Sequence, residues 1–417
     1  MLRKPSQSEC AALPKDAARR GPSVHIVGHP TAPIGMGEHV RSVARALREA
    51  GEQAMIVDIY GPSAHPDPDL VEAYAPFTTP FLSDDINIFC INADEVKQAF
   101  EVLASRNLTK YGSYNIISPA WELSEFPDEW IQYLERFDEI WAPSQFILDA
   151  IEPKTDVPVV HMPLACEIGV RGLFSRRHFG IPESSYCFLF AFDFLSYLER
   201  KNPNAVLDAF KKACDERPYA DVRLVLKLNN VDRKPETYAR FKDSFSDYKD
   251  RVVLIENTLS DPEMKALMWC IDCFVSLHRS EGWGRGISEA MDLGKPAIAT
   301  AYSGNMDFCT EETALLVPYE LVPVRPGDYP FWEGQKWASA DVDAAARMMV
   351  QLIDDPRGGE RIGRKARARM AAHYHFLPRG LAYARRLNEI WSAASAAQAA
   401  GRGKDDPLSR LSARTDA

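Results

Sequence analysis

The chain has 417 residues, of which 46% are hydrophobic and 26% charged, and its formal net charge is −10. This composition is ordinary for a globular protein, and the length allows two domains that each bury a core. The negative charge argues against nucleic-acid binding, because proteins that bind nucleic acids are usually basic. No run approaches the roughly 18 consecutive apolar residues of a spanning helix, so no transmembrane segment is expected.

The first 20 residues contain basic side chains without an apolar core, so we interpret them as a disordered tail and not as a secretory signal. Eight cysteines are scattered along the chain, and the one close pair, Cys270 and Cys273, lacks a second pair at zinc-site spacing. This scatter suits a cytoplasmic protein, which could also touch the inner face of the membrane. Asp67 and Asp69 have the form of a metal-binding DxD motif, but turn chemistry explains them, and no metal site is predicted.

Short apolar runs alternate with helical patterns from residue 24 to residue 394, which is typical of parallel α/β sheets. The first run, residues 24–28, leads into a loop with Gly35 and Gly37 and then into a helix that ends before Gly51. Strand, glycine loop and helix is the order of a phosphate-binding site, although no complete GxGxxG is present. Further strands of this first set are expected at 54–59, 86–91, 115–118, 139–142 and 157–161, with a helix at 94–105.

The loop 119–127 follows one of these strands. Ligands of open α/β sheets bind beyond the carboxyl ends of the strands, so this loop is expected to face a cleft. Trp121 and Glu122 are candidates for contacting a sugar, because aromatic rings stack on sugar faces. The alternative, weighted about equally, is that Trp121 plugs the domain edge and that Glu122 is solvated.

The composition changes at residues 163–177, where we place a linker between a first domain at 21–165 and a second domain at 176–375. A second set of strands is expected at 186–192, 223–228, 252–255, 274–277, 297–300 and 314–317. A helix is expected to begin at Trp337 and to continue through Ala344 and Met348. A last amphipathic helix spans 376–395, and residues 396–417 are interpreted as a flexible tail.

Arg200 and Lys201 lie just before a predicted helix of the second domain. A helix N-terminus has unpaired N–H groups and about half a positive charge, so a diphosphate could meet both cations and amides there. Taken singly, either residue is more simply a solvent-facing loop cation.

A glycine-dense loop, residues 281–286, opens a short helix that Gly294 ends. Glycines beside a helix N-terminus allow a ligand to approach the backbone closely. Glu281 and Glu289 are eight positions apart, and an ionised carboxylate can accept hydrogen bonds from both hydroxyls of a vicinal diol. Amides for phosphate and carboxylates for diols suit a nucleotide sugar. From composition alone, a capping Glu281 and a solvated Glu289 remain the simpler interpretation.

The segment from His278 to Phe308 resembles the donor site of the retaining GT-B glycosyltransferases of family 4 (glycosyl transferases group 1). Two glutamates separated by seven residues within an EGFG-type loop mark that site, and Glu281 and Glu289 have this spacing. The following GKPAIAT and SGN also match, whereas Trp283 and Arg285 depart from the usual pattern. The resemblance extends from about residue 24 to about residue 394.

The resemblance implies an α/β GT-B fold, in which two Rossmann-like parallel-sheet domains face each other across a cleft and the C-terminal helix crosses back. It implies a metal-independent hexosyltransferase of polysaccharide biosynthesis, which moves a mannose-type or glucose-type sugar from a nucleotide-diphosphate donor to a glycan or lipid-linked acceptor without any cofactor. Retention would proceed by front-face attack, with the leaving diphosphate accepting the proton. The alternatives are a non-catalytic nucleotide-sugar binder and a GT-B sugar-nucleotide epimerase or phosphorylase.

The same resemblance assigns residues to roles. Glu281 would hold sugar hydroxyls and Glu289 the ribose diol. The catalytic residues would be Arg200, Lys201 and Glu281; the donor would be bound by Gly35, Gly37, Gly282, Trp283, Gly284, Arg285, Gly286, Ile287 and Glu289; and the acceptor would be contacted by Trp121 and Glu122.

Overall fold

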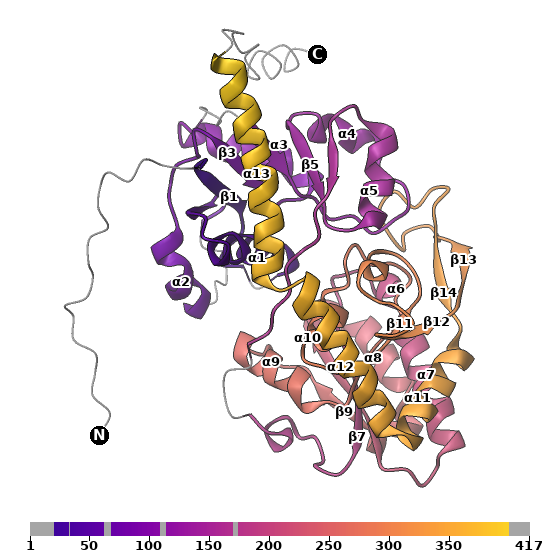
Figure 1. Ribbon diagram of the computed structural model, residues 1–417. Helices are drawn as coiled ribbons and strands as arrows, with labels where there is room; N and C mark the ends of the chain where they lie inside the picture. Colours follow the sequence, from indigo (N-terminus) through magenta and orange to yellow (C-terminus); the bar gives the residue numbers. More distant parts are fainter. Residues whose placement is uncertain (1–20, 33, 62–67, 109–113, 170–173, 400–417) are drawn as a thin grey trace, which may run out of the picture.

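Two parallel α/β domains make up the part of the chain that the computed structural model describes, which is residues 21–32, 34–61, 68–108, 114–169 and 174–399 (Figure 1). The tail expected at 1–20 and residues 400–417 of the C-terminal tail lie outside this part, as does Asp67 of the DxD pattern. The predicted fold class, two Rossmann-like sheets in one chain, is confirmed.

The first sheet has the strand order β2-β1-β3-β4-β5-β6, and every pair is parallel. Its strands are β1 (Val24–Gly28), β2 (Ala54–Asp58), β3 (Ile86–Phe89), β4 (Tyr114–Ile117), β5 (Glu139–Ala142) and β6 (Val159–His161). Its helices are α1 (Gly35–Glu49), α2 (Pro68–Tyr74), α3 (Val96–Ser105), α4 (Asp128–Leu134) and α5 (Gln145–Ile151), with short 3-10 turns η1 (Ala75–Phe77), η2 (Ala93–Glu95) and η3 (Glu152–Lys154).

The second sheet has the order β12-β11-β10-β7-β8-β9, again parallel throughout. Its strands are β7 (Tyr186–Asp193), β8 (Val222–Asn229), β9 (Val252–Ile255), β10 (Cys273–Ser276), β11 (Ala297–Thr300) and β12 (Leu315–Val317). The helical segments are η4 (Arg176–Phe179), α6 (Leu198–Lys201), α7 (Pro203–Glu216), η5 (Val231–Arg233), α8 (Pro235–Asp243), η6 (Ser246–Arg251), α9 (Asp261–Cys270), α10 (Arg285–Asp292), η7 (Gly304–Asp307), α11 (Val342–Asp354) and α12 (Pro356–His373).

Strand β7 illustrates why these apolar runs form buried strands. Its side chains alternate between the two faces of the sheet, as the pleat requires. Phe188 and Phe190 belong to the core on one side, whereas Cys187 and Leu189 belong to the core on the other. A strand that is apolar on both faces suits the middle of a parallel sheet covered by helices. The direction of the strand order changes between β7 and β10, so the loops after these two strands border the expected ligand crevice.

A small antiparallel sheet, β13 (Tyr319–Pro323) and β14 (Lys336–Ala340), was not expected from the sequence. The prediction that a helix begins at Trp337 is wrong, because Trp337 pairs with Val322 in this sheet. The helix α11 begins only after Asp341, whose side chain caps it by accepting from the N–H of Ala344 at 2.9 Å. Residues 319–340, which we call the hairpin insertion, belong to the second domain but reach the core of the first.

The last helix, α13 (Phe376–Ala399), leaves the second domain and packs against α1 of the first domain (Figure 1). Tyr383 is buried there and donates to the carbonyl oxygen of Pro163 at 2.6 Å. The guanidinium of Arg386 binds the buried carboxylate of Glu139. These contacts tie the end of the chain to the first domain. Within the described residues, no helix is both long enough and apolar enough to cross a lipid bilayer.

Candidate active site

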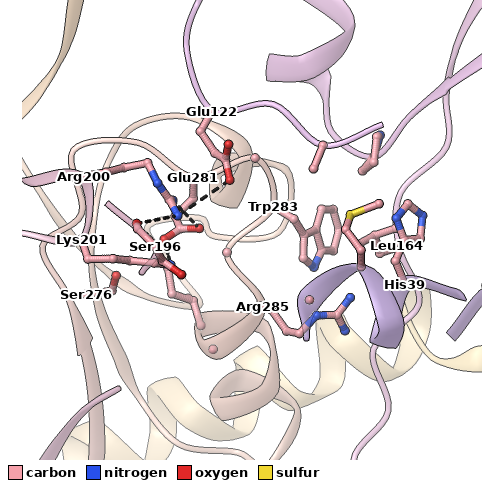
Figure 2. A pocket seen from close by; sticks show the side chains of 18 of the residues that line it. His39, Glu122, Leu164, Ser196, Arg200, Lys201, Ser276, Glu281, Trp283 and Arg285 are labelled. Atoms are coloured by element: carbon pink, nitrogen blue, oxygen red, sulfur yellow. Dashed lines mark hydrogen bonds and ion pairs between the residues drawn. The ribbon is translucent and has the colours of Figure 1, made fainter. Parts of the chain in front are cut away.

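A cavity of about 380 Å³ lies between the domains, at the carboxyl ends of strands from both sheets (Figure 2). Most of the predicted site residues line it, namely Gly35 and Glu122 from the first domain and Arg200, Lys201, Glu281, Gly282, Trp283, Gly284, Arg285, Gly286 and Ile287 from the second. The structure therefore brings together segments that are up to about 250 positions apart in the sequence. Gly37, Trp121 and Glu289 lie outside this cavity.

Arg200 and Lys201 occupy the short helix α6, which follows β7. Asn202, just after them, adopts a positive φ of 55° and donates from Nδ2 to the carbonyl oxygen of Leu277 at 2.9 Å. The N–H of Arg279 donates to the carbonyl oxygen of Arg200 at 2.8 Å. These bonds fix α6 against the loop that follows β10, so both cations are held beside the glycine loop.

The two cations and Glu281 form one ion-pair cluster (Figure 2). Lys201 Nζ lies 2.5 Å from Glu281 Oε1, and Arg200 Nη1 lies 3.2 Å from Glu281 Oε2. Burial alone would raise the pKa of Glu281, but Lys201 and Arg200 outweigh it and lower the pKa to about 2. Glu281 is therefore ionised at neutral pH.

Taken singly, Arg200 was expected to be a solvent-facing loop cation. It is instead buried, with only 5% of its surface exposed. Its Nη1 donates to the carbonyl oxygen of Ser280 at 3.0 Å, and its Nη2 lies 3.7 Å from Glu122 Oε1 across the domain boundary. Burial opposes the charge, but Glu281 and Glu122 raise the pKa of Arg200 above its usual value. The guanidinium is thus a buried, permanently charged group shared by both domains.

The glycine loop makes a direct contact between the domains. A Cβ atom on Gly282 would lie 2.7 Å from the carbonyl oxygen of Trp121, so only glycine fits without a shift. Ser144 Oγ of the first domain donates to the carbonyl oxygen of Gly282 at 2.6 Å. Gly284 then takes a φ of +93° and begins α10, whose first residue is Arg285. The N-terminus of α10 therefore borders the cavity.

Trp283 and Arg285 carry N–H groups that the rest of the described chain does not satisfy. The indole of Trp283 packs on Phe308, with 4.8 Å between the ring centroids, and its buried Nε1 has no hydrogen-bond partner among the described residues. Arg200 Nε is likewise buried without one. Arg285 forms no ion pair or hydrogen bond through its side chain within the described ranges. Unpaired donors at a cavity favour a ligand that is rich in acceptor oxygens.

Glu289 lies one turn beyond Arg285 on α10 and borders a separate hollow of about 60 Å³ with Asp261 and Lys265. Its side chain has no hydrogen-bond partner in the described part of the chain. Burial raises its pKa to about 7, against the attraction of Arg285. A carboxylate that lacks donors is consistent with the predicted binding of a diol, which remains a prediction.

Trp121 packs inside the first domain, in line with the alternative that it plugs the domain edge, and does not contact the cavity. Its ring is 2% exposed in the first-domain core, and its Nε1 donates to the carbonyl oxygen of Glu125 at 2.9 Å. The expectation that this ring stacks on a sugar is therefore wrong, because the aromatic neighbours already enclose it. Gly37 lies in the first turn of α1, and because a Cβ atom there would lie 2.1 Å from the carbonyl oxygen of Ala32, it allows the preceding turn to pack against the helix.

Two residues that contact charged or polar groups of the site, His39 and Tyr329, were not predicted from the sequence. His39 lines the cavity from α1, and burial and the charge of Arg285 lower its pKa to about 3, so it is neutral. Its place after Gly35 could have suggested it. Tyr329 of the hairpin insertion donates its hydroxyl to Glu122 Oε2, and nothing local in the sequence connects these two residues.

Residues 188–323 match the family model described as glycosyl transferases group 1. No protein of curated function matches the sequence significantly. Among solved structures, the Anabaena protein Alr3699/HepE in complex with UDP and glucose superposes with a TM-score of 0.64 at 14% identity, covering 88% of this chain and 100% of that one. Sucrose-phosphate synthase from Thermosynechococcus elongatus superposes with a TM-score of 0.61 at 15% identity, covering 89% of this chain and 100% of that one. A glycosyltransferase from Rickettsia africae superposes with a TM-score of 0.62 at 13% identity, covering 89% of this chain and 99% of that one.

The likeness to these structures extends over both domains, and the sequence match lies within the domain that carries Arg200, Lys201 and the glycine loop. The chain therefore has the GT-B fold, and its second domain is similar to the glycosyl transferases group 1.

Proposed function

We propose that the protein is a retaining, metal-independent hexosyltransferase that uses a nucleotide-diphosphate sugar and acts on a glycan or lipid-linked hydroxyl. The observation that carries this proposal is the placement of Arg200 and Lys201 beside the N-terminus of α10 in one inter-domain cavity. Two cations and a helix N-terminus match the charge and the oxygen acceptors of a diphosphate. The unpaired N–H groups of Arg200 and Trp283 add donors that such a ligand would satisfy.

In this proposal, the donor lies mainly on the second domain. The diphosphate contacts Arg200, Lys201 and the first amides of α10, and the ribose diol donates to Glu289. The similar Anabaena protein was solved with UDP-glucose, so a UDP-linked glucose-type donor is the first to test.

The reaction breaks the bond between the anomeric carbon and the diphosphate oxygen and forms a bond from that carbon to the acceptor oxygen. The acceptor proton passes to the leaving diphosphate. Negative charge grows on the diphosphate as its bond breaks, and Arg200 and Lys201 are already fixed where that charge appears. Glu281 keeps both cations in place and accepts from the hydroxyls of the transferred sugar. Two side-chain cations make a metal ion unnecessary for neutralising the diphosphate.

Incubation with UDP-, GDP- and ADP-linked glucose and mannose, together with a mixture of free and lipid-linked glycans, tests the proposal. Release of the nucleoside diphosphate with a glycosylated product whose anomeric configuration equals that of the donor supports it. An inverted product would contradict retention. Binding of the nucleotide without release would favour a non-catalytic binder, and an altered sugar on an intact nucleotide would favour an epimerase. A sugar phosphate that forms from the glycans when inorganic phosphate is added would favour a phosphorylase.

A further inference from the structure

The hairpin insertion reaches across the domain boundary to the loop that carries Glu122. Gln335 Nε2 donates to the carbonyl oxygen of Glu125 at 2.8 Å, and Ser124 Oγ donates to Gln335 Oε1 at 3.3 Å. Val324 and Trp337 are buried in the core of the first domain. The insertion therefore supports the loop that contributes Glu122 to the lining of the cavity.

Tyr329, near the middle of this insertion, sets the position of Glu122. It is 6% exposed, its ring centroid lies 5.7 Å from that of Trp121, and its hydroxyl donates to Glu122 Oε2. The other carboxylate oxygen, Glu122 Oε1, has only Arg200 Nη2 nearby, at 3.7 Å, which is beyond hydrogen-bond distance. Within the described residues, this oxygen is free to accept a hydrogen bond from a ligand in the cavity.

Tyr197 follows the cavity-lining residue Ser196 and packs against Tyr329. Its ring centroid lies 4.7 Å from that of Tyr329, yet Tyr197 is 43% exposed. Its backbone has a φ of 57°, which is unfavourable for a bulky side chain and persists only where the surroundings enforce it. The carbonyl oxygen of Tyr197 accepts from the backbone N–H groups of Arg200 and Lys201 at 3.0 and 3.2 Å, so the backbone of Tyr197 is fixed at the start of α6.

We propose that Tyr197, Tyr329 and Glu122 form the acceptor subsite, and that it takes an uncharged pyranose. The exposed face of Tyr197 stacks on the sugar ring, Glu122 Oε1 accepts from a sugar hydroxyl, and Tyr329 is a positioning residue that orients Glu122. An aromatic face with a carboxylate acceptor suits a neutral polyol. A carboxylate or phosphate in place of that hydroxyl would meet an acceptor of like charge, which Arg200 at 3.7 Å, already paired with Glu281, offsets only in part, so an anionic sugar is disfavoured. This assignment rests on the proposed glycosyltransferase function.

Saturation-transfer-difference NMR tests the subsite without requiring turnover. The probes are methyl α-D-glucopyranoside and its 6-carboxylate counterpart, methyl α-D-glucuronoside, each titrated onto the full-length protein. We expect the neutral probe to bind at least about tenfold more tightly than the anionic one. Tyr197→Leu should lower the affinity for the neutral probe about tenfold, because it removes the aromatic face but keeps an apolar side chain. Tyr197→Phe keeps the aromatic face and should bind the probe as tightly as wild type does.

Tyr329→Phe should weaken the neutral probe severalfold, because Glu122 loses the hydroxyl that orients it while the ring packing is kept. The matched control is Tyr219→Leu, since Tyr219 is fully exposed on the second domain and remote from the cavity lining. Equal binding of both probes, no binding of either to wild type, or wild-type affinity in Tyr197→Leu would overturn the assignment.

A failure of the wider function would look different. If no nucleoside diphosphate binds and none is released from any donor, the proposed glycosyltransferase is wrong whatever the glycoside data show. If the nucleotide is released but Tyr197→Leu leaves the acceptor KM unchanged, only the subsite is wrong.

Discussion

Lys201 Nζ lies 2.5 Å from Glu281 Oε1, so the cation assigned to phosphate and the carboxylate assigned to sugar hydroxyls are bound to each other. Arg200 joins the same carboxylate from its other side. A diphosphate that enters must therefore share two cations that already have a partner. Glu281 thus keeps the positive charge of the site compensated and in place.

Replacing Glu281 with Gln should destabilise the protein, because two largely buried cations lose their common negative partner. Breaking such a pair costs about 3 kcal/mol or more. A nucleoside diphosphate brings the missing charge, so 1 mM UDP or GDP should raise the melting temperature of Glu281→Gln more than that of wild type. Scanning calorimetry with and without nucleotide measures both effects. Glu360→Gln, at an exposed position of α12, is the control, and an unchanged melting temperature in Glu281→Gln would refute the structural part of this assignment.

Replacing Arg200 or Lys201 with Ala should lower kcat by about two to three decades, because each stabilises charge that develops only as the sugar–phosphate bond breaks. Arg200→Lys should recover part of this loss, since lysine cannot reproduce the planar fork. Arg200→Ala should also lower the melting temperature, because Glu281 and Glu122 lose a buried partner. Steady-state kinetics below the melting transition are compared with Lys249→Ala, an exposed lysine elsewhere in the second domain. Wild-type kcat in both alanine variants is the outcome that excludes this role.

Glu289 should make nucleotide binding depend on pH around 7. Burial raises the pKa of Glu289 to about 7, and only the ionised form accepts from both ribose hydroxyls. Affinity for UDP or GDP should therefore rise as the pH increases through 7, and Glu289→Gln should bind more weakly and lack this component. The nucleotide's own phosphate titrates near pH 6 in both proteins, so the difference between their calorimetric titrations isolates Glu289. Parallel profiles would disprove the ribose assignment.

The ionisation of Glu289 should affect the stability of the fold in the opposite direction from its effect on nucleotide affinity. Folded Glu289 keeps its proton up to about pH 7, whereas the unfolded chain releases it near 4.5. The native state thus binds more protons between these values, so the free energy of unfolding should fall as pH rises from 4.5 to 7. Urea titrations of wild type and Glu289→Gln across this window measure the difference, and a wild-type curve that rises relative to the variant would contradict it.

Chelation should leave transfer intact, because Arg200 and Lys201 already supply the positive charge that a metal ion would bring. Rates measured in 5 mM EDTA should equal those measured in 5 mM magnesium or manganese. Lost activity that manganese restores would show that the two cations are insufficient.

The sequence predicted the two sheets well because each strand is a short apolar run with a local boundary. The expected strands at 139–142, 252–255 and 297–300 coincide with β5, β9 and β11. The glycine loop was recognised for a similar reason, since its glycines and glutamates are close together in the chain. Such features depend on interactions within a few residues.

The hairpin insertion was missed because its structure depends on contacts with residues that are distant in the sequence. Residues 337–340 contain two alanines and precede a real helix, so they resembled its first turn, but pairing with β13 makes them a strand. The contact from Tyr329 to Glu122 spans 207 positions, and the burial of Trp121 depends on the same insertion. Arg200 likewise contacts Ser280, Glu281 and Glu122, which all lie about 80 positions away in the sequence, so its burial is not visible in any local stretch.

The most direct test of the central claim is nucleoside diphosphate release from UDP-, GDP- and ADP-linked hexoses by wild type and by Lys201→Ala, followed together with glycosylation of an added glycan. We expect wild type to release the nucleotide from at least one donor in proportion to the product formed, and Lys201→Ala to be slower by about two to three decades. Release at equal rates in both proteins, or no release from any donor by wild type, would contradict a glycosyltransfer site built on these cations.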